Sequence, residues 1–356
     1  MSESREDRLE SWARKHAAEQ LGVAGEELAL VNVSGDASFR RYSRLSSDEG
    51  SLILVDAPPE HEDNHRFLRI ARIMRGAGLA VPEVYAANLE LGFMLLEDLG
   101  DELYYHRLLQ CQQNVDWSQA EALYRDAIDA LIQLQAGVPA AQLDHYGRSE
   151  LHREMRLFDE WFCGQLLGLE LTDSTRTLLA ETYALLEDAA LAQVQVAVHR
   201  DYHSRNLMLT VAQGQPTGPG ILDFQDAVTG AYTYDLVSLL KDCYLRWPED
   251  KVRQWSGYYL DQARSTGLVS DEQSKNFSRD FDLMGLQRHL KVLGIFSRLS
   301  IRDNKTGYLA DIPLVIRYFS DAARRRPEML TFLDWFDNDV RPRAASTLNL
   351  DLECEP

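Results

Sequence analysis

The polar segment HRDYHSRN, residues 199–206, constrains the fold of this chain more than any other stretch. It lies between the apolar runs VQVAV and LMLTV, and a third run, ILDF, follows the turn-rich segment AQGQPTGPG. This order predicts a β-hairpin with the polar segment at its open end. Asn206 would enter one strand of this hairpin as Asp223 leaves its neighbour, so the two side chains would face each other although 17 positions separate them.

The pattern of apolar residues changes near residue 100. Before it, EDRLESWARKHAAEQ has helical spacing, and four short runs are β-like: LALVNV, FRRYSRL, SLILVDA and FMLLEDL. Between the third and fourth runs, a helix with one apolar face ends at Gly76 and Gly78. The rest of the chain predicts a helix that begins at a capping box of Ser118 and Glu121, and further helices over 150–167, 173–192, 233–266, 271–300 and 311–338.

These patterns predict an α+β fold with two lobes. We expect a small sheet-rich lobe over residues 1–98 and a larger, mostly helical lobe over residues 99–340. The remaining residues, 341–356, are expected to form a loose tail.

Composition narrows the class of protein. The 356 residues are 45% hydrophobic and 26% charged, which is typical of a globular chain long enough for two lobes. The sequence contains no run of about 18 apolar residues and its N-terminus is charged, so we expect a cytoplasmic protein without a membrane span. Four widely spaced cysteines indicate neither disulfides nor a zinc site. A net charge of -19 argues against nucleic-acid binding. We further expect the protein to be a monomer and its substrate to be a small molecule.

The polar residues around the hairpin form a set that phosphoryl transfer requires. This reaction depends on positioning and charge stabilisation, with one carboxylate to orient the acceptor hydroxyl and hard oxygen ligands to hold magnesium. Asp201 suits the first role, Asn206 and Asp223 suit the second, and His199 is expected to brace the loop. An isolated HxD is more often a polar turn, but the ordered set favours catalysis.

At these residues the sequence resembles the protein-kinase-like phosphotransferases, and more narrowly the aminoglycoside phosphotransferase and choline kinase branch. His199-x-Asp201-x-x-x-x-Asn206 matches the catalytic loop of that superfamily, and the DFQD segment that begins at Asp223 matches its metal-binding loop. Asp235 resembles the family's aspartate that anchors the catalytic loop. The resemblance implies a bilobal kinase-like fold, a nucleotide-binding N-terminal lobe, a catalytic C-terminal lobe, and ATP and Mg²⁺ as cofactors. The short interval between Asp223 and Asp235 leaves no room for an activation loop, which favours a small-molecule acceptor.

The predicted nucleotide site departs from the family pattern. The loop VSGDASF has one glycine instead of a Gly-rich run, so it is either a phosphate-covering loop or an ordinary hairpin turn. The third strand carries no lysine, and Arg40 or Arg41 of the preceding strand could replace it unless both are surface arginines. The helical partner glutamate stays unassigned between Glu62 and Asp63. The LLEDLGDE stretch resembles the hinge whose backbone binds adenine. The candidate nucleotide-binding residues are Ser34, Gly35, Asp36, Ser38, Arg41, Glu97 and Leu99.

Several longer stretches resemble a narrower family, among them DAPPEHEDNHRFL, GLAVPEV, VHRDYHSRNLM and LQRHLKVLGIFSRLSIRDNKTGYL. These are similar to the bacterial anomeric sugar kinases of cell-wall recycling, over about residues 25 to 340. The resemblance implies ATP-dependent phosphorylation of the anomeric hydroxyl of N-acetylmuramate and N-acetylglucosamine, giving sugar 1-phosphates in peptidoglycan recycling.

The sugar pocket is defined less sharply by the sequence. The lactyl carboxylate of N-acetylmuramate calls for a cation, and the helical stretch from Arg288 to Lys305 offers several, although such a stripe is more often a solvated helix face. Asp201, Tyr202, Arg288 and Arg298 are the candidate substrate contacts. Two alternatives stay open: an aminoglycoside or amino-alcohol phosphotransferase, and a non-catalytic nucleotide-binding pseudokinase module.

Overall fold

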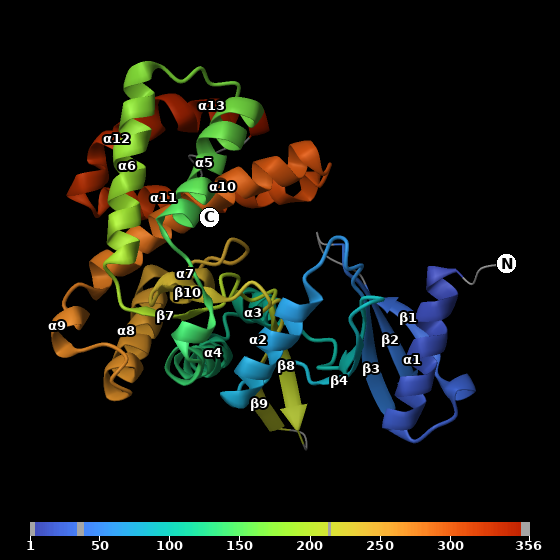
Figure 1. The fold of residues 1–356 in the computed structure, drawn as a ribbon. Coiled ribbons are helices and arrows are strands. Elements are labelled where there is room, and N and C mark those ends of the chain that lie inside the picture. The colour runs from blue at the N-terminus through green and yellow to red at the C-terminus, as the bar shows by residue number, and fades with distance from the viewer. Residues whose placement is uncertain (1–3, 34–38, 213–214, 350–356) are drawn as a thin grey trace. The chain divides into compact units, whose positions relative to one another are not determined.

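The computed structural model describes residues 4–33, 39–212 and 215–349. The chain forms two compact units, and each is described by itself. The first takes in residues 1–107 and 205–226, and the second takes in residues 108–204 and 227–356. Figure 1 shows the elements along the chain by colour. Helix α3 (Tyr104–Asn114) carries the chain from the first unit to the second.

The first unit therefore differs from the lobe expected over residues 1–98, because it continues to residue 107 and includes the hairpin that follows the catalytic loop. Backbone hydrogen bonds explain the difference. The N–H of Leu209 donates to the carbonyl of Glu102 at 2.7 Å, and the N–H of Ile221 donates to the carbonyl of Ala80 at 2.8 Å. The assignment of nucleotide binding to one part and catalysis to the other stays a prediction.

The sheet of the first unit has five antiparallel strands in the order β1-β2-β3-β5-β4. Their bounds are Ala29–Val33 for β1, Arg41–Ser47 for β2, Gly50–Asp56 for β3, Val84–Asn88 for β4 and Phe93–Glu97 for β5. Helix α1 (Arg5–Leu21) begins at a capping box formed by Ser4 and Asp7. Its buried Ala13 and Ala17 pack against apolar side chains of the sheet. Figure 1 shows α1 beside the sheet strands.

Helix α2 (Asn64–Gly76) links β3 and β4 and has the predicted amphipathic pattern. Asp63 caps its first turn by accepting the N–H of Arg66, and its buried side chains include Phe67, Ile70 and Met74. The helix ends at Gly76, and Gly78 follows with a φ of 81°. The predicted helix end is therefore confirmed.

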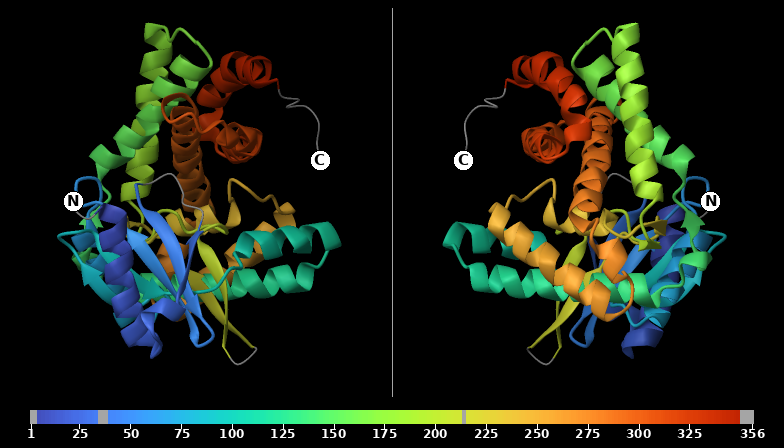
Figure 2. Two further views of the ribbon diagram at one scale, coloured as in Figure 1. Left: turned by 90° about the vertical axis from the view of Figure 1, so that its right-hand side faces the viewer. Right: turned by 90° about the vertical axis from the view of Figure 1, so that its left-hand side faces the viewer.

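The predicted hairpin is also confirmed. Strands β8 (Leu207–Ala212) and β9 (Gln215–Ile221) pair antiparallel, with Leu207 opposite Ile221. In both views of Figure 2 these two strands run side by side. Their register places the residues that flank them, Asn206 and Leu222, next to each other.

The second unit is mostly helical and contains one small sheet with the strand order β6-β10-β7. The sheet strands are Asp144–His145 (β6), Gln195–Val198 (β7) and Val228–Ala231 (β10). The helices are α4 (Trp117–Gly137), α5 (Arg148–Leu157), α6 (Asp173–Leu191), α7 (Tyr234–Leu240), α8 (Glu249–Ser265), α9 (Asp271–Ser274), α10 (Phe277–Arg302), α11 (Ile312–Arg324), α12 (Leu330–Trp335) and α13 (Arg341–Leu348). The long helix α10 packs against α5, α6 and α11, and together they bury the main apolar core of this unit (Figure 1).

Several helix predictions were wrong in their boundaries. The helix expected over 271–300 is divided into α9 and α10, and the helix expected over 311–338 is divided into α11 and α12. The helix expected over 233–266 is interrupted, because α7 ends at Leu240 and α8 begins only after its N-cap residue Pro248. The capping box expected at Ser118 is replaced by Asp116, whose carboxylate accepts the N–H of Gln119 at 3.1 Å. Residues 341–348 of the expected loose tail form α13, because Ala344 is buried in the core of the second unit.

Two further expectations can be compared with the described residues. Within them, no helix is both long and apolar enough to cross a membrane. Cys111, Cys163 and Cys243 are buried free thiols, as their wide spacing predicts.

Candidate active site

The loop after β7 carries the predicted catalytic residues of the second unit. Asp235, in the first turn of α7, accepts hydrogen bonds from the backbone N–H groups of His199 and Arg200 at 2.6 Å and 3.0 Å. The side chain of His199 is buried, and its Nδ1 accepts the N–H of Asp201 at 3.3 Å. By these contacts Asp235 holds the loop backbone at two residues and His199 holds it at one, and their part in catalysis stays a prediction.

The backbone of this loop is strained at one residue. Arg200 has a φ of 81°, in the left-handed region that non-glycine residues rarely adopt. Such a conformation costs on the order of 1–3 kcal/mol and persists only where the surroundings hold it. The paired hydrogen bonds to Asp235 provide that support on the residue directly before Asp201.

A second buried carboxylate, which sequence reasoning missed, holds the other end of the loop. The N–H of Ser204 donates to Oδ2 of Asp242 at 3.0 Å, and its hydroxyl donates to the same oxygen. Between the two anchors, the side chain of Tyr202 is buried and its hydroxyl donates to the carbonyl of Ala127 at 2.8 Å. The one signal for this anchor was Asp242, which follows the apolar run of α7 within the stretch LLKDCY.

Asp201 is half-buried among cationic side chains. Burial alone would raise the pKa of its carboxyl, but Lys291, His203 and Arg288, with Arg200, lower that pKa to about 2. The group therefore stays ionised at neutral pH. A carboxylate of this kind is a strong hydrogen-bond acceptor but a weak proton acceptor, so it can orient a hydroxyl throughout the physiological pH range.

The cations beside Asp201 are held by Glu154 of α5. The Nζ of Lys291 lies 3.0 Å from Oε2 of Glu154, and Arg200 pairs with the Oε1 of the same carboxylate. The hydroxyl of Tyr146 also donates to Glu154. Desolvation would raise the pKa of Glu154, but the positive charges of Lys291 and Arg200 lower it by a larger amount. The net pKa of Glu154 therefore lies below its ordinary value. One buried carboxylate therefore fixes two of the charges that act on Asp201.

A glycine allows α5 and α10 to bring these groups together. A Cβ atom added at Gly294 of α10 would overlap backbone atoms of Leu157 at the end of α5. Only glycine leaves room for this helix approach, which places Glu154 against Lys291 one turn earlier on α10.

Replacing Glu154 with alanine is expected to lower the free energy of unfolding by about 3–5 kcal/mol at neutral pH, because Lys291 and Arg200 would lose their buried counter-charge. Urea unfolding of the purified chain measures the change. The pKa of Glu154 lies below its ordinary value of 4.5, so its stabilisation is present above that pH and is lost as the pH falls. The difference between wild type and variant should therefore narrow below a pH of about 4.5.

The exposed Glu181 of α6 provides the matched control, and Glu181→Ala is expected to change stability by less than about 0.5 kcal/mol. A stability difference for Glu154→Ala that stayed constant from neutral pH to pH 3 would contradict an ionised Glu154 as the source of the effect.

In the first unit, the hairpin brings together the two predicted metal ligands. The carbonyl of Asn206 accepts the N–H of Leu222 at 2.9 Å, so Asn206 lies beside the residue before Asp223. Asp223 has a φ of 59°, which aspartate tolerates better than most side chains. Gln225, which stands where protein kinases have glycine, donates from Nε2 to Oδ1 of Asp223 at 2.7 Å.

Helix α2 supports this loop from within the same unit. The Nε of Arg66 donates to the carbonyl of Gln225 at 2.8 Å, and the ring of Phe67 lies 4.9 Å from that of Phe224. The loop that carries Asp223 is therefore fixed to α2 by one polar and one aromatic contact.

The oxygen donors of Asn206 and Asp223 are of the kind that Mg²⁺ prefers. Among the described residues, no group of three or more His, Cys, Asp or Glu side chains could hold a metal ion. A pair of protein ligands suits Mg²⁺, which usually keeps water and phosphate oxygens in its remaining coordination positions. The pair fits the ion, and its role as a magnesium site remains a proposal.

The structure separates the predicted nucleotide-binding residues. Ser34, Gly35, Asp36 and Ser38 lie outside the described residues. Arg41 is exposed and pairs with Asp56 at 2.7 Å and with Glu6 at 3.3 Å. This places Arg41 in ion pairs near α1, and we no longer assign it to the nucleotide.

The predicted hinge residues lie at the end of β5. Oε2 of Glu97 accepts the backbone N–H of Glu83 at 3.1 Å. The backbone N–H of Glu97 in turn donates to the carbonyl of Glu83 at 2.8 Å. The backbone N–H of Glu97 is therefore already used within the sheet. Leu99 packs near Gly220 of β9, where an added Cβ would lie 2.8 Å from its Cδ1. A role of Leu99 in binding adenine stays a prediction.

The predicted sugar-binding residues differ in accessibility. Tyr202 is buried and hydrogen-bonded to the backbone, so we do not retain it as a sugar contact. Arg288 is 3% exposed and its Nη1 lies 3.5 Å from Sγ of Cys243, which favours an electrostatic role toward Asp201. Arg298 is half-buried, and its buried Nε has no hydrogen-bond partner among the described residues. Arg298 thus remains the candidate for binding an anionic group.

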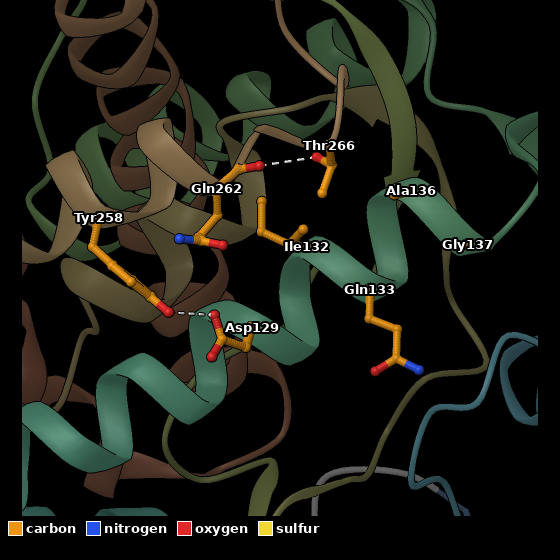
Figure 3. Close-up of a pocket in the computed structure, with 8 residues that line it drawn as sticks. All are labelled: Asp129, Ile132, Gln133, Ala136, Gly137, Tyr258, Gln262 and Thr266. Carbon is orange, nitrogen blue, oxygen red and sulfur yellow. Dashed lines mark hydrogen bonds between the residues drawn. The ribbon is translucent and has the colours of Figure 1, made fainter. Parts of the chain in front are cut away.

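A separate pocket of about 500 Å³ lies between α4 and α8 of the second unit (Figure 3). Asp129, Ile132 and Gln133 of α4 line one side of it, and Tyr258 of α8 donates a hydrogen bond to Asp129 at 2.8 Å. None of the described candidate site residues lines this pocket. It therefore plays no part in the assignment of the active site.

Comparison with known proteins adds independent findings. A sequence model of the phosphotransferase enzyme family matches residues 29–271. The chain is 44% identical over 301 residues to an N-acetylmuramate/N-acetylglucosamine kinase of Pseudomonas putida, covering 85% of each chain. It is 39% identical over 326 residues to a protein of the same name from Neisseria meningitidis, covering 91% of this chain and 93% of that one.

Solved structures also match. An ethanolamine kinase of Plasmodium vivax has a TM-score of 0.63 and 12% identity, covering 89% of this chain and 90% of its own. At this identity the likeness concerns the fold alone. It confirms the predicted kinase-like α+β fold, with a small sheet-rich part and a larger helical part.

Proposed function

The chain belongs to the phosphotransferase enzyme family, and from this premise we propose that it transfers the γ-phosphoryl group of ATP to the anomeric hydroxyl of N-acetylmuramate and N-acetylglucosamine. The products would be sugar 1-phosphates, formed in peptidoglycan recycling. The observation that carries the proposal is the similarity over most of the chain to relatives named for these two sugars. The loop geometry around Asp201 supports it chemically.

Asp201 is proposed to accept the hydrogen bond of the anomeric hydroxyl. As the anomeric oxygen forms its bond to the γ-phosphorus, the bond from that phosphorus to ADP breaks with its electron pair leaving on ADP, and the hydroxyl proton passes to Asp201. A carboxylate with a pKa of about 2 is a weak base. It suits an anomeric hydroxyl, which is more acidic than an ordinary alcohol, and a transition state governed by positioning.

Asn206 and Asp223 are proposed to hold Mg²⁺, which would neutralise charge on the phosphates when ATP is bound. Gln225 keeps one oxygen of Asp223 hydrogen-bonded and so orients the carboxylate. Asp235 and Asp242 act on the loop backbone at both sides of Asp201 and keep its carboxylate in place.

We also propose that the protein is cytoplasmic, since its co-substrate ATP is a cytoplasmic metabolite. We propose separately that it is a monomer. Light scattering on the purified chain tests the monomer, for which a mass of 40.6 kDa is expected.

A panel of acceptors tests the proposed reaction. The purified chain is incubated with ATP, Mg²⁺ and one of N-acetylmuramate, N-acetylglucosamine, an aminoglycoside or ethanolamine, and ADP release is followed. Release that depends on either amino sugar supports the proposal. Turnover of the aminoglycoside or ethanolamine without turnover of the sugars would reject it in favour of the rival phosphotransferase, and ATP binding without any turnover would favour a pseudokinase.

Arg298 provides a test of sugar selectivity. Burial and the neighbouring Arg302 lower its pKa, which indicates an environment with too little negative charge around this guanidinium. Arg298 lies two turns beyond Lys291 on α10, or about 10 Å along the helix. A lactyl carboxylate bound there would supply the missing anion, whereas N-acetylglucosamine has no such group.

Arg298→Ala is therefore expected to raise the KM for N-acetylmuramate by roughly 10- to 100-fold, as loss of a charged hydrogen bond predicts. The KM for N-acetylglucosamine should change by less than about twofold. Steady-state kinetics with both sugars measure the two values. Equal increases for both sugars would exclude recognition of the lactyl carboxylate by Arg298.

A further inference from the structure

A buried ion pair lies next to the metal-binding loop inside the first unit. The Nη2 of Arg40, directly before β2, is 2.9 Å from Oε2 of Glu62, directly before the cap of α2. The side chains are 5% and 12% exposed, so both charges are largely removed from water. Burying such a pair seldom improves stability over apolar side chains. A pair in this position therefore calls for a functional explanation.

Strand geometry determines which of two neighbouring arginines faces the metal-binding loop. Successive side chains along a strand point to opposite faces of the sheet. Arg41 pairs with Glu6 of α1 and with Asp56, to which Arg5 of α1 is also bound. Arg40 therefore points to the opposite face.

On that face, Arg40 contacts the elements that support Asp223. Its guanidinium lies 5.4 Å from the ring centre of Phe67 on α2, and Phe67 packs against Phe224. Phe224 directly follows Asp223, so Phe67 connects Arg40 with the metal-binding loop.

The strand on which the family carries its lysine has no cationic side chain in this chain. Strand β3, with the sequence GSLILVD, contains no basic residue. Arg41 pairs in register with Asp56, the last residue of β3, so Arg40 lies at the end of the sheet where β3 stops. A guanidinium there is suited to phosphate, because its planar donors can bind two phosphate oxygens at once.

We infer that Arg40, oriented by Glu62, binds the phosphates of ATP next to the loop on which Asp223 would hold magnesium, in place of the lysine that β3 lacks. The inference rests on the proposed function in requiring ATP as the phosphoryl donor. Arg40 contacts the nucleotide, and Glu62 is a positioning residue that fixes its guanidinium. The pair takes the place of a lysine–glutamate pair, but with the cation directly before β2 instead of on β3.

Nucleotide binding in the absence of sugar tests this inference. Isothermal titration of the full chain with a non-hydrolysable ATP analogue, with ADP and with adenosine separates phosphate contacts from base contacts. Arg40→Gln is expected to weaken the ATP analogue by roughly 10- to 100-fold and to leave adenosine affinity within about twofold. Arg72→Gln, on the exposed side of α2, is the matched control and should bind all three ligands as wild type does.

Two further variants keep the test decisive if Arg40→Gln folds poorly. Arg40→Lys keeps the charge and should recover part of the lost affinity for the ATP analogue, and Glu62→Gln should weaken the analogue less than Arg40→Gln does. Thermal unfolding verifies that each variant is folded. Equal loss of adenosine and the ATP analogue in the folded variants, or a loss in Arg41→Gln with none in Arg40→Gln, would overturn the inference.

These outcomes are separable from failure of the proposed reaction. A wild-type chain that binds the ATP analogue but phosphorylates neither amino sugar would refute the proposed acceptor. The affinities of Arg40→Gln and Arg72→Gln for the ATP analogue could still be compared and would still test the role of Arg40. A wild-type chain without phosphate-dependent affinity would refute the role of Arg40 itself.

Discussion

Asp201→Asn is expected to lower kcat for N-acetylmuramate by about 100- to 10,000-fold, the range observed when a positioned general base is lost. Asparagine keeps the size of the side chain but cannot accept the hydroxyl proton. It also leaves the cluster of Lys291, Arg288 and Arg200 without one of its anions. Nucleotide affinity should stay within about threefold of wild type, because Asp201 acts on the acceptor.

The measurement is ADP release under saturating ATP and sugar, together with titration of an ATP analogue. Asp250→Asn, an exposed aspartate in the first turn of α8, is the matched control. Unchanged kcat in a folded Asp201→Asn chain would exclude the proposed role of this carboxylate.

Asp223→Ala is expected to reduce kcat/KM by about 1,000-fold, since a metal ion that stabilises the transferred phosphoryl group contributes several kcal/mol. Asp223 is exposed at the end of the hairpin, so its loss should leave the fold intact. Activity measured against Mg²⁺ concentration should show that the variant needs far more metal or fails to saturate. Asp48→Ala, in the exposed turn between β2 and β3, controls for the loss of an acidic side chain. A variant with a wild-type Mg²⁺ dependence would show that Asp223 is not a ligand.

Local patterns allowed the sequence to predict much of the loop region. The hairpin follows from two apolar runs and a turn, and its register then places Asn206 beside the residue before Asp223. Asp235 was identifiable because it begins a helix within a recognisable motif, and its two backbone hydrogen bonds agree with that prediction. These features depend on neighbours in sequence or on a single pairing of strands.

Contacts between distant elements were not predictable in the same way. Glu154 reads as an ordinary helical glutamate, and only the close approach of α5 and α10 at Gly294 makes it the counter-ion of Lys291 and Arg200. The role of Asp242 likewise depends on a distant residue, because its carboxylate accepts the N–H of Ser204, 38 residues earlier.

Arg40 and Arg41 could be distinguished only once it was known to which face of the sheet each side chain points. Successive side chains alternate between the two faces, so Arg41 points toward α1 and Arg40 toward α2. Glu62, which the sequence could not distinguish from Asp63, is the partner of Arg40, whereas Asp63 caps α2. The helix expected over 233–266 ends early, at Leu240, and Asp242 two residues later accepts the N–H of Ser204. This contact joins residues distant in sequence, so the helical pattern did not reveal it.

Identification of the product formed from N-acetylmuramate tests the central claim most directly. The full chain is incubated with ATP, Mg²⁺ and N-acetylmuramate, and the phosphorylated sugar is analysed by ³¹P and ¹H NMR. We predict one α-1-phosphate, with phosphorus coupled to the anomeric proton and one ADP formed per sugar phosphate. Phosphate on any other hydroxyl, or no sugar phosphate while another acceptor is turned over, would contradict the account.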